Sequence, residues 1–326
     1  MLQTSLEIDI NKINKNNIFL ELEKEISRVI IGNNEVIRSI IIGILCQSHI
    51  LVEGPPGVAK TTLIKSFAQA MGLSFKRIQF TPDLLPSDII GTVIFNSKKN
   101  DFEVRKGPLF ANIILADEIN RTPAKVQAAL LEAMQEKQIT IGMETFKLDE
   151  PFIVFATQNP LEHEGTYQLP EAQIDRFMMK LYLGYPTQNE EIEIIKKAKE
   201  NQILNQIIDK NILIEASEMV KQVFVSEQII NYIATIVQAT RKPLDFGLTK
   251  IAEYIDYGAS PRASLALYNA AQALAFLESR SFVVPDDIKK IAPFIIGHRI
   301  GIKYNFDQQI NGLELVRKII ANIKTP

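Results

Sequence analysis

A compact glycine- and proline-rich loop lies between two segments of different character. The apolar run 50–52 ends close to Gly54, and a helix-like segment, 63–70, follows Lys60-Thr61-Thr62. A strand, a tight turn and a helix N-terminus in this order form a phosphate-binding loop, because the loop amides and the positive helix end face one small volume. An ordinary strand–turn–helix corner has no need of the Lys-Thr pair. The residues that we expect to bind a nucleotide here are Gly54, Pro55, Pro56, Gly57, Val58, Ala59, Lys60, Thr61 and Thr62.

Three positions in this loop carry specific expectations. Lys60 would reach the outer phosphates, and the hydroxyl of Thr61 would be a ligand of Mg²⁺. Ala59 stands where the general pattern GxxxxGK[ST] has its second glycine. Since alanine disfavours a positive φ, we expect Ala59 to lie where the turn has already become helical.

Composition narrows the class of protein. The chain has 326 residues, enough for two domains, and a net charge of −2 from 36 basic and 38 acidic residues, so no global field draws it to nucleic acid or anionic membrane. The lone Cys46 excludes a disulfide framework and suits a reducing compartment. The apolar stretch 39–47 is too short to span a bilayer, and the N-terminus lacks the pattern of a signal peptide. We expect a cytoplasmic protein with no membrane segment.

Apolar strand candidates recur with helical segments such as 124–136 between them. They are 50–52, 75–80, 113–116, 152–156 and 177–183. This alternation predicts an α/β fold, with a central parallel five-stranded sheet covered on both faces. Two β-hairpins, within 91–105 and 138–148, are predicted as insertions into it.

The two ends of the chain read as helical. Near the N-terminus, a turn at Gly32 and Asn33 separates two helices, and Asn33 is the expected N-cap of the second. Beyond residue 185, nearly everything to Pro326 has helical periodicity. We therefore divide the chain into an α/β nucleotide-binding domain, 1–185, and a separate α-helical domain, 186–326.

Two carboxylates follow the apolar strand candidate 113–116. Asp117 and Glu118 would lie at the carboxyl edge of the sheet, where α/β proteins bind ligands. Asp117 would hold Mg²⁺, directly or through water, and Glu118 would activate the attacking water, because phosphoryl transfer needs charge neutralisation and a positioned nucleophile. The simpler alternative is a strand-end pair that caps the next helix.

The next strand candidate ends at Thr157-Gln158-Asn159-Pro160. Asn159 can orient a water molecule, because its amide both donates and accepts hydrogen bonds. By itself, this tetrapeptide is equally typical of an Asn-Pro turn.

Two arginines are candidates for action on phosphate. Arg176 precedes the last strand and would face away from its own loop, so its functional use would be in trans, on a neighbouring subunit's nucleotide; the alternative is a surface ion pair with Asp175. Arg262 follows Ser260-Pro261 on the first turn of a helix, where a cation needs an anion to compensate the helix dipole. Phosphate and a structural carboxylate are both open as that anion.

Together, these segments resemble the MoxR family of AAA+ ATPases. The resemblance covers roughly residues 20–305 in unbroken motif order. It rests on GPPGVAKT (54–61), LADEINR (115–121), ATQNP (156–160), GTYQLPEAQIDRF (165–177) and GASPR (258–262). An alanine before the P-loop lysine is usual in that family.

The resemblance implies a role for each candidate. The loop 54–62 would be Walker A, Asp117 and Glu118 Walker B, Asn159 sensor 1, Arg176 the arginine finger with Arg121 as runner-up, and Arg262 sensor 2. Gly32 and Asn33 are placed among the nucleotide-binding residues. The hairpins would be the helix-2 insert and the pre-sensor 1 hairpin, and the helical domain the lid.

The resemblance also implies ATP or ADP with Mg²⁺ as cofactors, a hexameric homo-oligomer, and a von Willebrand factor A-domain partner. The leading hypothesis is an ATP-hydrolysing, chaperone-like remodeller that matures, activates or assists metal insertion into a protein client. Alternatives are a helicase-like DNA motor, a nucleotide-dependent scaffold without turnover, and a chelatase-type ATPase subunit. The basic residues Lys98, Lys99, Arg105 and Lys106 of the first hairpin favour the DNA motor, while the net charge opposes it.

Overall fold

The structure is a computed structural model that describes residues 17–159, 167, 169–197, 203–303 and 310–326. The motif residues 160–166 and 168 lie outside the described residues. The strands of the central sheet are β1 (Ile50–Glu53), β2 (Phe75–Gln79), β5 (Ile113–Asp117), β8 (Ile153–Gln158) and β9 (Met179–Tyr182). They are all parallel, in the order β2-β5-β8-β1-β9, which confirms the predicted five-stranded sheet.

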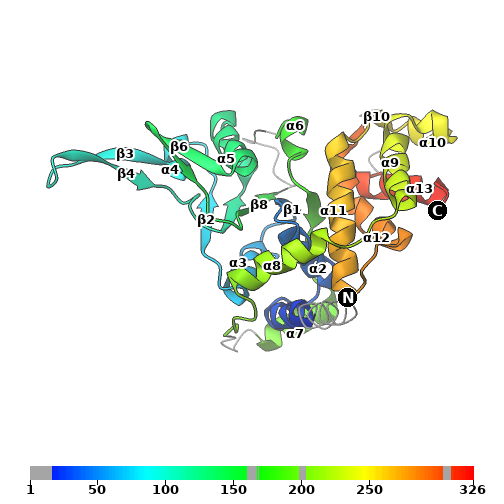
Figure 1. Cartoon of the computed structure of the whole chain (residues 1–326), viewed down its shortest axis with the longest axis horizontal. Coiled ribbons are helices and arrows are strands. Elements are labelled where there is room, and N and C mark those ends of the chain that lie inside the picture. The colour runs from blue at the N-terminus through cyan, green and yellow to red at the C-terminus, as the bar shows by residue number, and fades with distance from the viewer. Residues whose placement is uncertain (1–16, 160–166, 168, 198–202, 304–309) are drawn as a thin grey trace, which may run out of the picture.

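Helices surround this sheet and make up most of the second half of the chain (Figure 1). Residues 17–29 are helical. The other helices are α2 (Asn34–Leu45), α3 (Lys60–Ala70), α4 (Pro86–Ile90), α5 (Ala124–Glu136), α6 (Glu171–Ile174), α7 (Gln188–Lys197), α8 (Lys210–Lys221), α9 (Glu227–Arg241), α10 (Thr249–Ala252), α11 (Pro261–Leu277), α12 (Pro285–Ile296) and α13 (Gly312–Asn322). Short 3₁₀ turns are η1 (Ile119–Arg121), η2 (Pro243–Phe246) and η3 (Gly297–Arg299).

The central strands are apolar because both faces of the sheet are covered. Successive residues of a strand point to opposite faces, so Ile50 and Val52 of β1 join one hydrophobic cluster and Leu51 joins the other. The first cluster contains residues of α2, α3 and the C-terminal helices, and the second contains residues of α5. The sheet is therefore a buried central layer. Polar groups can gather only where its strands begin and end, and we call these two sides the amino edge and the carboxyl edge of the sheet.

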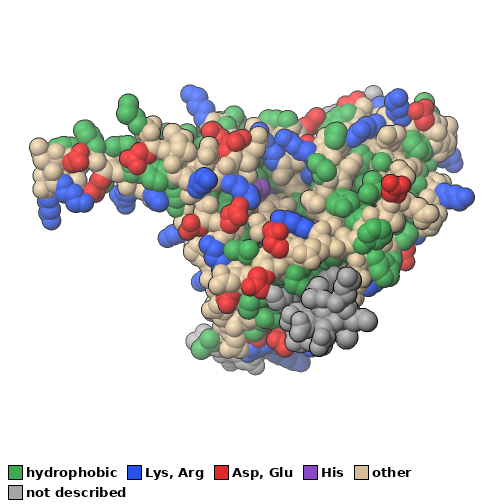
Figure 2. Space-filling model, in the orientation of Figure 1, with side chains coloured by type: hydrophobic (Ala, Val, Ile, Leu, Met, Phe, Trp, Pro, Cys, Tyr) green, Lys and Arg blue, Asp and Glu red, His purple; other side chains and the backbone are tan. Residues whose placement is uncertain are grey.

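The two predicted hairpins are confirmed. β3 (Gly91–Asn96) pairs with β4 (Asp101–Lys106), and β6 (Gln138–Ile141) pairs with β7 (Glu144–Lys147), both antiparallel. The β3–β4 hairpin extends from the body as an arm (Figure 1). Acidic and basic side chains are interspersed along this arm (Figure 2).

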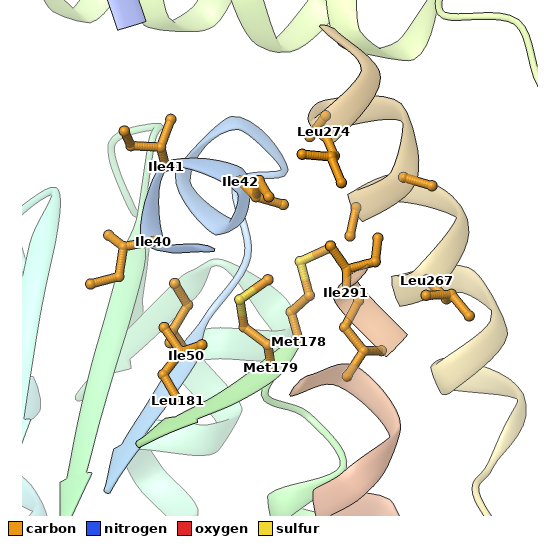
Figure 3. Packing of buried hydrophobic residues seen from close by; sticks show 14 of the residues in the cluster. Ile40, Ile41, Ile42, Ile50, Met178, Met179, Leu181, Leu267, Leu274 and Ile291 are labelled. Atoms are coloured by element: carbon orange, nitrogen blue, oxygen red, sulfur yellow. The ribbon is translucent and has the colours of Figure 1, made fainter. Parts of the chain in front are cut away.

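The C-terminal helices pack directly on the core of the first half. All the residues from Ser39 to Leu45 of α2 are buried, and the isoleucines and the leucine among them lie in the same hydrophobic cluster as residues of α11 and α12. Ile42 of α2 faces Leu274 of α11, and Met178 and Met179 lie beside Ile291 of α12 (Figure 3). Burial of such a side chain is worth roughly 1.5–3 kcal/mol. One core thus continues across residue 185, and the proposed boundary there stays a prediction.

The described part of the second half is mainly helical, as predicted, but it also contains short β-structure. A two-stranded antiparallel ribbon joins β10 (Ile255–Tyr257) to β11 (Gly301–Ile302). Its strands are too short to show period-two alternation in the sequence. In the described part of the chain, no helix is both long and apolar enough to cross a membrane.

Candidate nucleotide-binding site

The loop between β1 and α3 has the geometry of a phosphate cradle. Gly54 is buried, and a Cβ atom there would come within 2.3 Å of the Leu183 carbonyl oxygen, so only glycine fits. Gly57 has φ 85° and open space around it. The Lys60 ammonium folds back over the loop and donates to the Gly54 carbonyl at 2.6 Å. A turn of this kind directly before the N-terminus of a helix favours a bound anion.

The expectation for Ala59 is wrong. Its φ is 61° and its ψ 26°, which is the left-handed region, and it is the N-cap of α3 rather than a helical residue. The helix begins one residue later, at Lys60. The left-handed conformation costs an L-residue about 1–2 kcal/mol. This is the kind of local strain that functional loops hold, and it lies where the chain turns from the loop into α3.

Asp117 ends β5 with both of its carboxylate oxygens engaged. Its Oδ1 accepts from the Thr157 hydroxyl at 2.6 Å. Its Oδ2 accepts from Nε of Arg77 at 2.9 Å and lies 2.7 Å from Nη2 of the same guanidinium. Neither Thr157 nor Arg77 was singled out in the sequence, although Thr157 lies in the ATQNP motif and Arg77 on a predicted strand.

Glu118 is the next residue, and it too has a left-handed backbone, with φ 58°. Its amide donates to the Thr157 hydroxyl oxygen at 2.9 Å, so Thr157 links the Asp117 carboxylate to the Glu118 backbone. The Glu118 carboxylate accepts from the Gln79 amide at 2.8 Å and pairs with Nε of Arg121 at 3.2 Å. Arg121 thus lies beside its own chain's carboxylates.

Asn159 lies between the carboxylates, at the end of β5, and the loop, which follows β1. It directly follows β8, which separates β5 from β1 in the sheet, and it is buried with 7% of its surface exposed. The carboxylates, Asn159 and the loop therefore meet at one edge, as predicted from the strand ends.

The groups at this edge fit a magnesium nucleotide. Thr61 and Asp117 offer hard oxygen donors, which Mg²⁺ prefers, and Mg²⁺ is usually held by one or two carboxylates together with phosphate oxygens rather than by a protein cage. Among the described residues, no group of three or more His, Cys, Asp or Glu forms such a cage. The donor set thus suits a metal that arrives with a phosphate.

Gly32 and Asn33 are placed at the start of α2. A Cβ atom on Gly32 would clash with the Glu190 carboxylate of α7, so this turn packs against α7. Asn33 occupies the N-cap position, but its side chain makes no cap hydrogen bond and its φ is 57°. The side-chain cap is therefore wrong, because a left-handed backbone turns the side chain away from the helix amides, and nucleotide contact at this turn stays a prediction.

Arg176 lies at the opposite edge of the sheet. It precedes β9, whereas the P-loop follows β1, and the two strands run parallel. It lines a cavity of about 300 Å³ together with Arg262 of α11, Lys137 and His49. In the described part of the chain, Nε of Arg176 is buried and has no hydrogen-bond partner.

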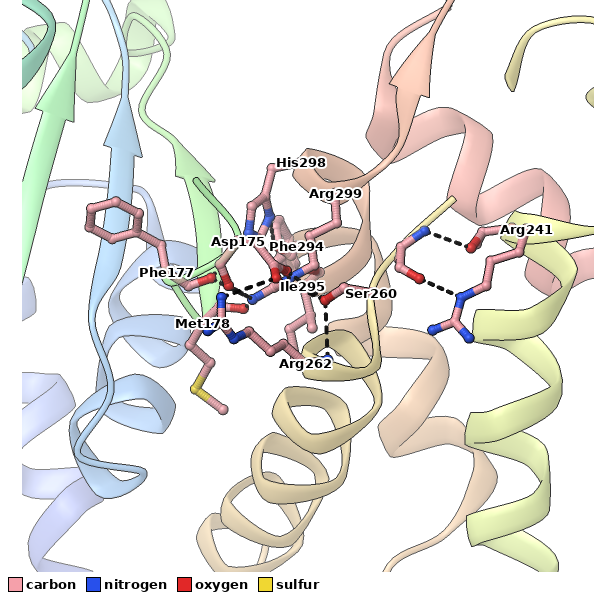
Figure 4. Close-up of polar contacts among 12 residues, drawn as sticks. Asp175, Phe177, Met178, Arg241, Ser260, Arg262, Phe294, Ile295, His298 and Arg299 are labelled. Atoms are coloured by element: carbon pink, nitrogen blue, oxygen red, sulfur yellow. Dashed lines mark hydrogen bonds and ion pairs between the residues drawn. The ribbon is translucent and has the colours of Figure 1, made fainter. Parts of the chain in front are cut away.

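The alternative ion pair of Arg176 with Asp175 is wrong. Asp175 instead pairs with the C-terminal half of the chain: its carboxylate accepts from the Ser260 hydroxyl at 2.8 Å and from Nε of Arg299 at 2.8 Å (Figure 4). Arg262 lies 3.5 Å from the same carboxylate with half of its side chain exposed. A structural carboxylate is thus the anion near Arg262 in this structure. Ser260 also caps α11 by accepting from the Arg262 amide at 3.1 Å.

Arg299 and His298 fasten the C-terminal helices to this edge. The Arg299 guanidinium is 3% exposed and donates to the Asp175 carboxylate and to the carbonyl oxygens of Phe177, Met178 and Ile295. The His298 ring contacts the Phe177 carbonyl oxygen through Nε2 at 3.1 Å, and burial together with Arg299 holds its pKa well below the usual value. The sequence did not indicate either residue, because no local motif or periodicity reports a contact between positions 121 or 124 residues apart.

His49 lies at the base of the cavity as a neutral ring. Its Nδ1 accepts from the Val154 amide at 3.0 Å, so the proton is on Nε2, which faces the Met134 carbonyl oxygen at 3.1 Å. Burial lowers the pKa of His49 to about 4. The hydrogen bonds of this histidine therefore connect the start of β1 with β8 and the end of α5. Both ring nitrogens are engaged in these bonds, so we assign His49 a structural role rather than that of a general base.

Known proteins share this architecture over the whole chain. The model of the ATPase family associated with various cellular activities matches residues 49–179, and an AAA lid domain matches residues 248–319. Chaperone MoxR1 of Mycobacterium tuberculosis is 42% identical over 93% of this chain and 81% of its own length. The protein YeaC of Bacillus subtilis is 43% identical over 93% of both chains.

A solved structure extends the similarity to three dimensions. A candidate ATPase from Cytophaga hutchinsonii superposes with a TM-score of 0.92 at 46% identity, covering 100% of this chain and 99% of its own. The expected resemblance is confirmed, and ATP hydrolysis comes with it. The chain belongs to the MoxR family of AAA+ ATPases.

Proposed function

We propose that this ATPase hydrolyses ATP at sites shared between neighbouring copies of itself and uses the cycle to remodel a protein client. The observation that carries the proposal is the separation of the two edges of the sheet. The P-loop with Asp117 and Glu118 lies at one edge, and Arg176 with Arg262 lies at the other. Four residues of parallel strand at about 3.3 Å each put roughly 13 Å between them.

This distance favours action in trans for both arginines. A side chain cannot reach from one end of a buried strand to the other, so Arg176 and Arg262 serve a nucleotide held by the next subunit. The unpartnered Nε of Arg176 in a cationic cavity supports this use. Arg121 is the weaker candidate, because it pairs with Glu118 of its own chain. Closed head-to-tail contacts generate rings, and we propose a homo-oligomeric ring of the hexameric type.

The residues at the carboxyl edge divide the chemistry. Lys60 and the loop amides bind the phosphates, and Thr61 and Asp117 hold the metal, which supplies charge neutralisation when bound. Glu118 accepts a proton from the attacking water, and Asn159 orients that water. Arg176 of the neighbour stabilises the charge that develops on the transferred phosphoryl group.

The contacts made by the basic side chains of the β3–β4 arm favour a protein client over DNA. Lys99 pairs with Glu103 at 3.3 Å, and the Lys106 ammonium lies 4.8 Å from the Phe110 ring centroid and 4.9 Å from that of Phe146. Two of the four basic residues thus have partners within the protein, which leaves little charge for a phosphate backbone. The name of the relative Chaperone MoxR1 supports a chaperone-like role. Maturation or metal loading of the client, and a von Willebrand factor A-domain partner, are the finer parts of this proposal.

Mixing two inactive variants tests the shared site. Lys60→Ala removes the phosphate lysine, and Arg176→Ala removes the arginine of the opposite edge. In a one-to-one mixture, about a quarter of the interfaces combine an intact loop with an intact arginine. We therefore expect ATPase activity to return to about a quarter of wild type when the subunits are co-expressed or reassembled, as measured by phosphate release.

Two controls define the result. Arg317→Ala removes an exposed arginine of α13 and should leave activity unchanged. Analytical ultracentrifugation must show that the mixed subunits co-assemble. If mixed rings form and no activity returns, action of Arg176 in trans is wrong.

A further inference from the structure

A closed ring of hydrogen bonds joins the two carboxylates of the ATPase site through the edge strand β2. The Gln79 amide donates to Glu118 at 2.8 Å, and the Gln79 oxygen accepts from Arg77 Nη2 at 2.7 Å. Arg77 pairs with Asp117 Oδ2 at 2.7 Å. The Thr157 hydroxyl closes the ring by donating to Asp117 and accepting from the Glu118 amide. Arg77 thus contacts the Asp117 carboxylate directly and the Glu118 carboxylate through Gln79.

Arg77 supplies the counter-charge that Asp117 needs when no metal is bound. The Asp117 side chain is only 10% exposed, and a buried carboxylate is costly without a cation. Arg77 is 48% exposed, so its guanidinium can move into water at little cost. The pair is therefore asymmetric: Asp117 depends on a partner, and Arg77 does not.

The guanidinium and a divalent cation compete for the same carboxylate. Both Nε and Nη2 of Arg77 contact Oδ2, and Thr157 donates to Oδ1, so Arg77 occupies one of the two carboxylate oxygens and Oδ1 keeps one acceptor position. A divalent cation near Arg77 is also repelled by it. The metal and the guanidinium therefore compete for the same negative charge, and uptake of a metal by Asp117 weakens its pair with Arg77.

We propose that Arg77 is a positioning residue that holds Asp117 in a metal-free resting state and that is displaced when Asp117 takes up the metal. Displacement also breaks the hydrogen bond from Arg77 to the Gln79 oxygen, while Glu118 keeps its ion pair with Arg121. Since β2 continues through α4 into the β3–β4 arm, the same exchange reaches the base of the arm. This inference rests on the proposed metal role of Asp117.

Manganese binding to the ADP-loaded full-length protein tests the exchange without relying on turnover. Free Mn²⁺ is followed by electron paramagnetic resonance during a titration. Arg77→Ala removes the competing cation, and we expect Mn²⁺ to bind roughly three- to tenfold more tightly, in line with the strength of a partly exposed ion pair. Arg77→Lys retains a point charge and should remain close to wild type.

Two further variants separate this inference from the site assignment. Lys76→Ala removes an exposed cation from the neighbouring position of β2, which makes no contact with Asp117, and should leave Mn²⁺ affinity unchanged. Asp117→Asn should abolish tight Mn²⁺ binding; if it does not, the metal role of Asp117 fails and the inference falls with it. If Asp117→Asn loses Mn²⁺ while Arg77→Ala binds it as wild type or more weakly, only the exchange is wrong.

Thermal unfolding gives a second readout that a purely structural arginine would not produce. In EDTA, Arg77→Ala leaves Asp117 without a counter-charge, so its midpoint should lie below that of wild type. With Mg²⁺ and ADP, the metal replaces the missing cation and the gap should close. A gap of equal size in both conditions would overturn the exchange.

Discussion

The two edges of the central sheet are built on different principles. At the carboxyl edge, the P-loop and Asn159 directly follow strands and Asp117 ends one, so short sequence motifs position them. At the opposite edge, Arg176 and Arg262 are positioned by contacts between residues far apart in the chain, such as that of Arg299 with Asp175. The carboxyl edge thus holds the residues of the ATPase site, which short motifs place. The opposite edge holds the contacts that join the sheet to the C-terminal helices.

The largest effect is expected at the carboxyl edge, from Glu118→Gln. The variant keeps the shape of the side chain and removes the base, so ATP hydrolysis should fall by about 10²–10⁴-fold. ATP binding, followed with a fluorescent nucleotide, should persist. Glu136→Gln, an exposed change at the end of α5, is the matched control and should hydrolyse ATP normally. If Glu118→Gln hydrolysed ATP as fast as wild type, the assignment of Glu118 as the base that activates water would be wrong.

The fold and the carboxyl edge could be predicted because their signals are local. Hydrophobic runs marked the strands, and Asp117, Glu118 and Asn159 follow strand ends whose neighbours are fixed by the sheet. Arg77 and Thr157 escaped notice because their importance comes from side chains that meet across strands. Arg299 escaped notice because it contacts Asp175 over 124 residues, and no periodicity or motif reports such a contact.

At the opposite edge, the expected effect is on stability. Arg299→Ala leaves the Asp175 carboxylate and several carbonyl groups without their buried donor, which should lower the free energy of unfolding by about 3–5 kcal/mol. Arg262→Ala removes a half-exposed partner of the same carboxylate at 3.5 Å and should cost no more than about 1 kcal/mol. Urea denaturation compares the two. If the two variants lost the same free energy of unfolding, the proposed role of Arg299 in joining the C-terminal helices to the sheet would be wrong.

Acid should weaken the opposite edge through His49. The folded protein keeps His49 neutral with a pKa of about 4, and an unfolded histidine has a pKa of about 6.5. The unfolded state therefore binds the proton first, and stability falls as the pH drops from 6.5 to 4, by about 3 kcal/mol from this residue. His298, with its lowered pKa, acts in the same direction. Denaturation across this range should show a shallower pH dependence in His49→Gln, and an unchanged dependence would contradict the assignment.

The smallest effect concerns the strained residue of the carboxyl edge. Ala59→Gly relieves the left-handed backbone, worth about 1 kcal/mol, but loosens the unfolded chain by a similar amount, so the free energy of unfolding should change by less than ~1 kcal/mol. Ala59→Val places a β-branched residue at φ 61° and should destabilise the protein by more than ~1 kcal/mol. Nucleotide affinity, measured alongside, should persist in Ala59→Gly and fall in Ala59→Val. Equal affinities in both would mean that the left-handed turn at Ala59 is not needed to form the phosphate cradle.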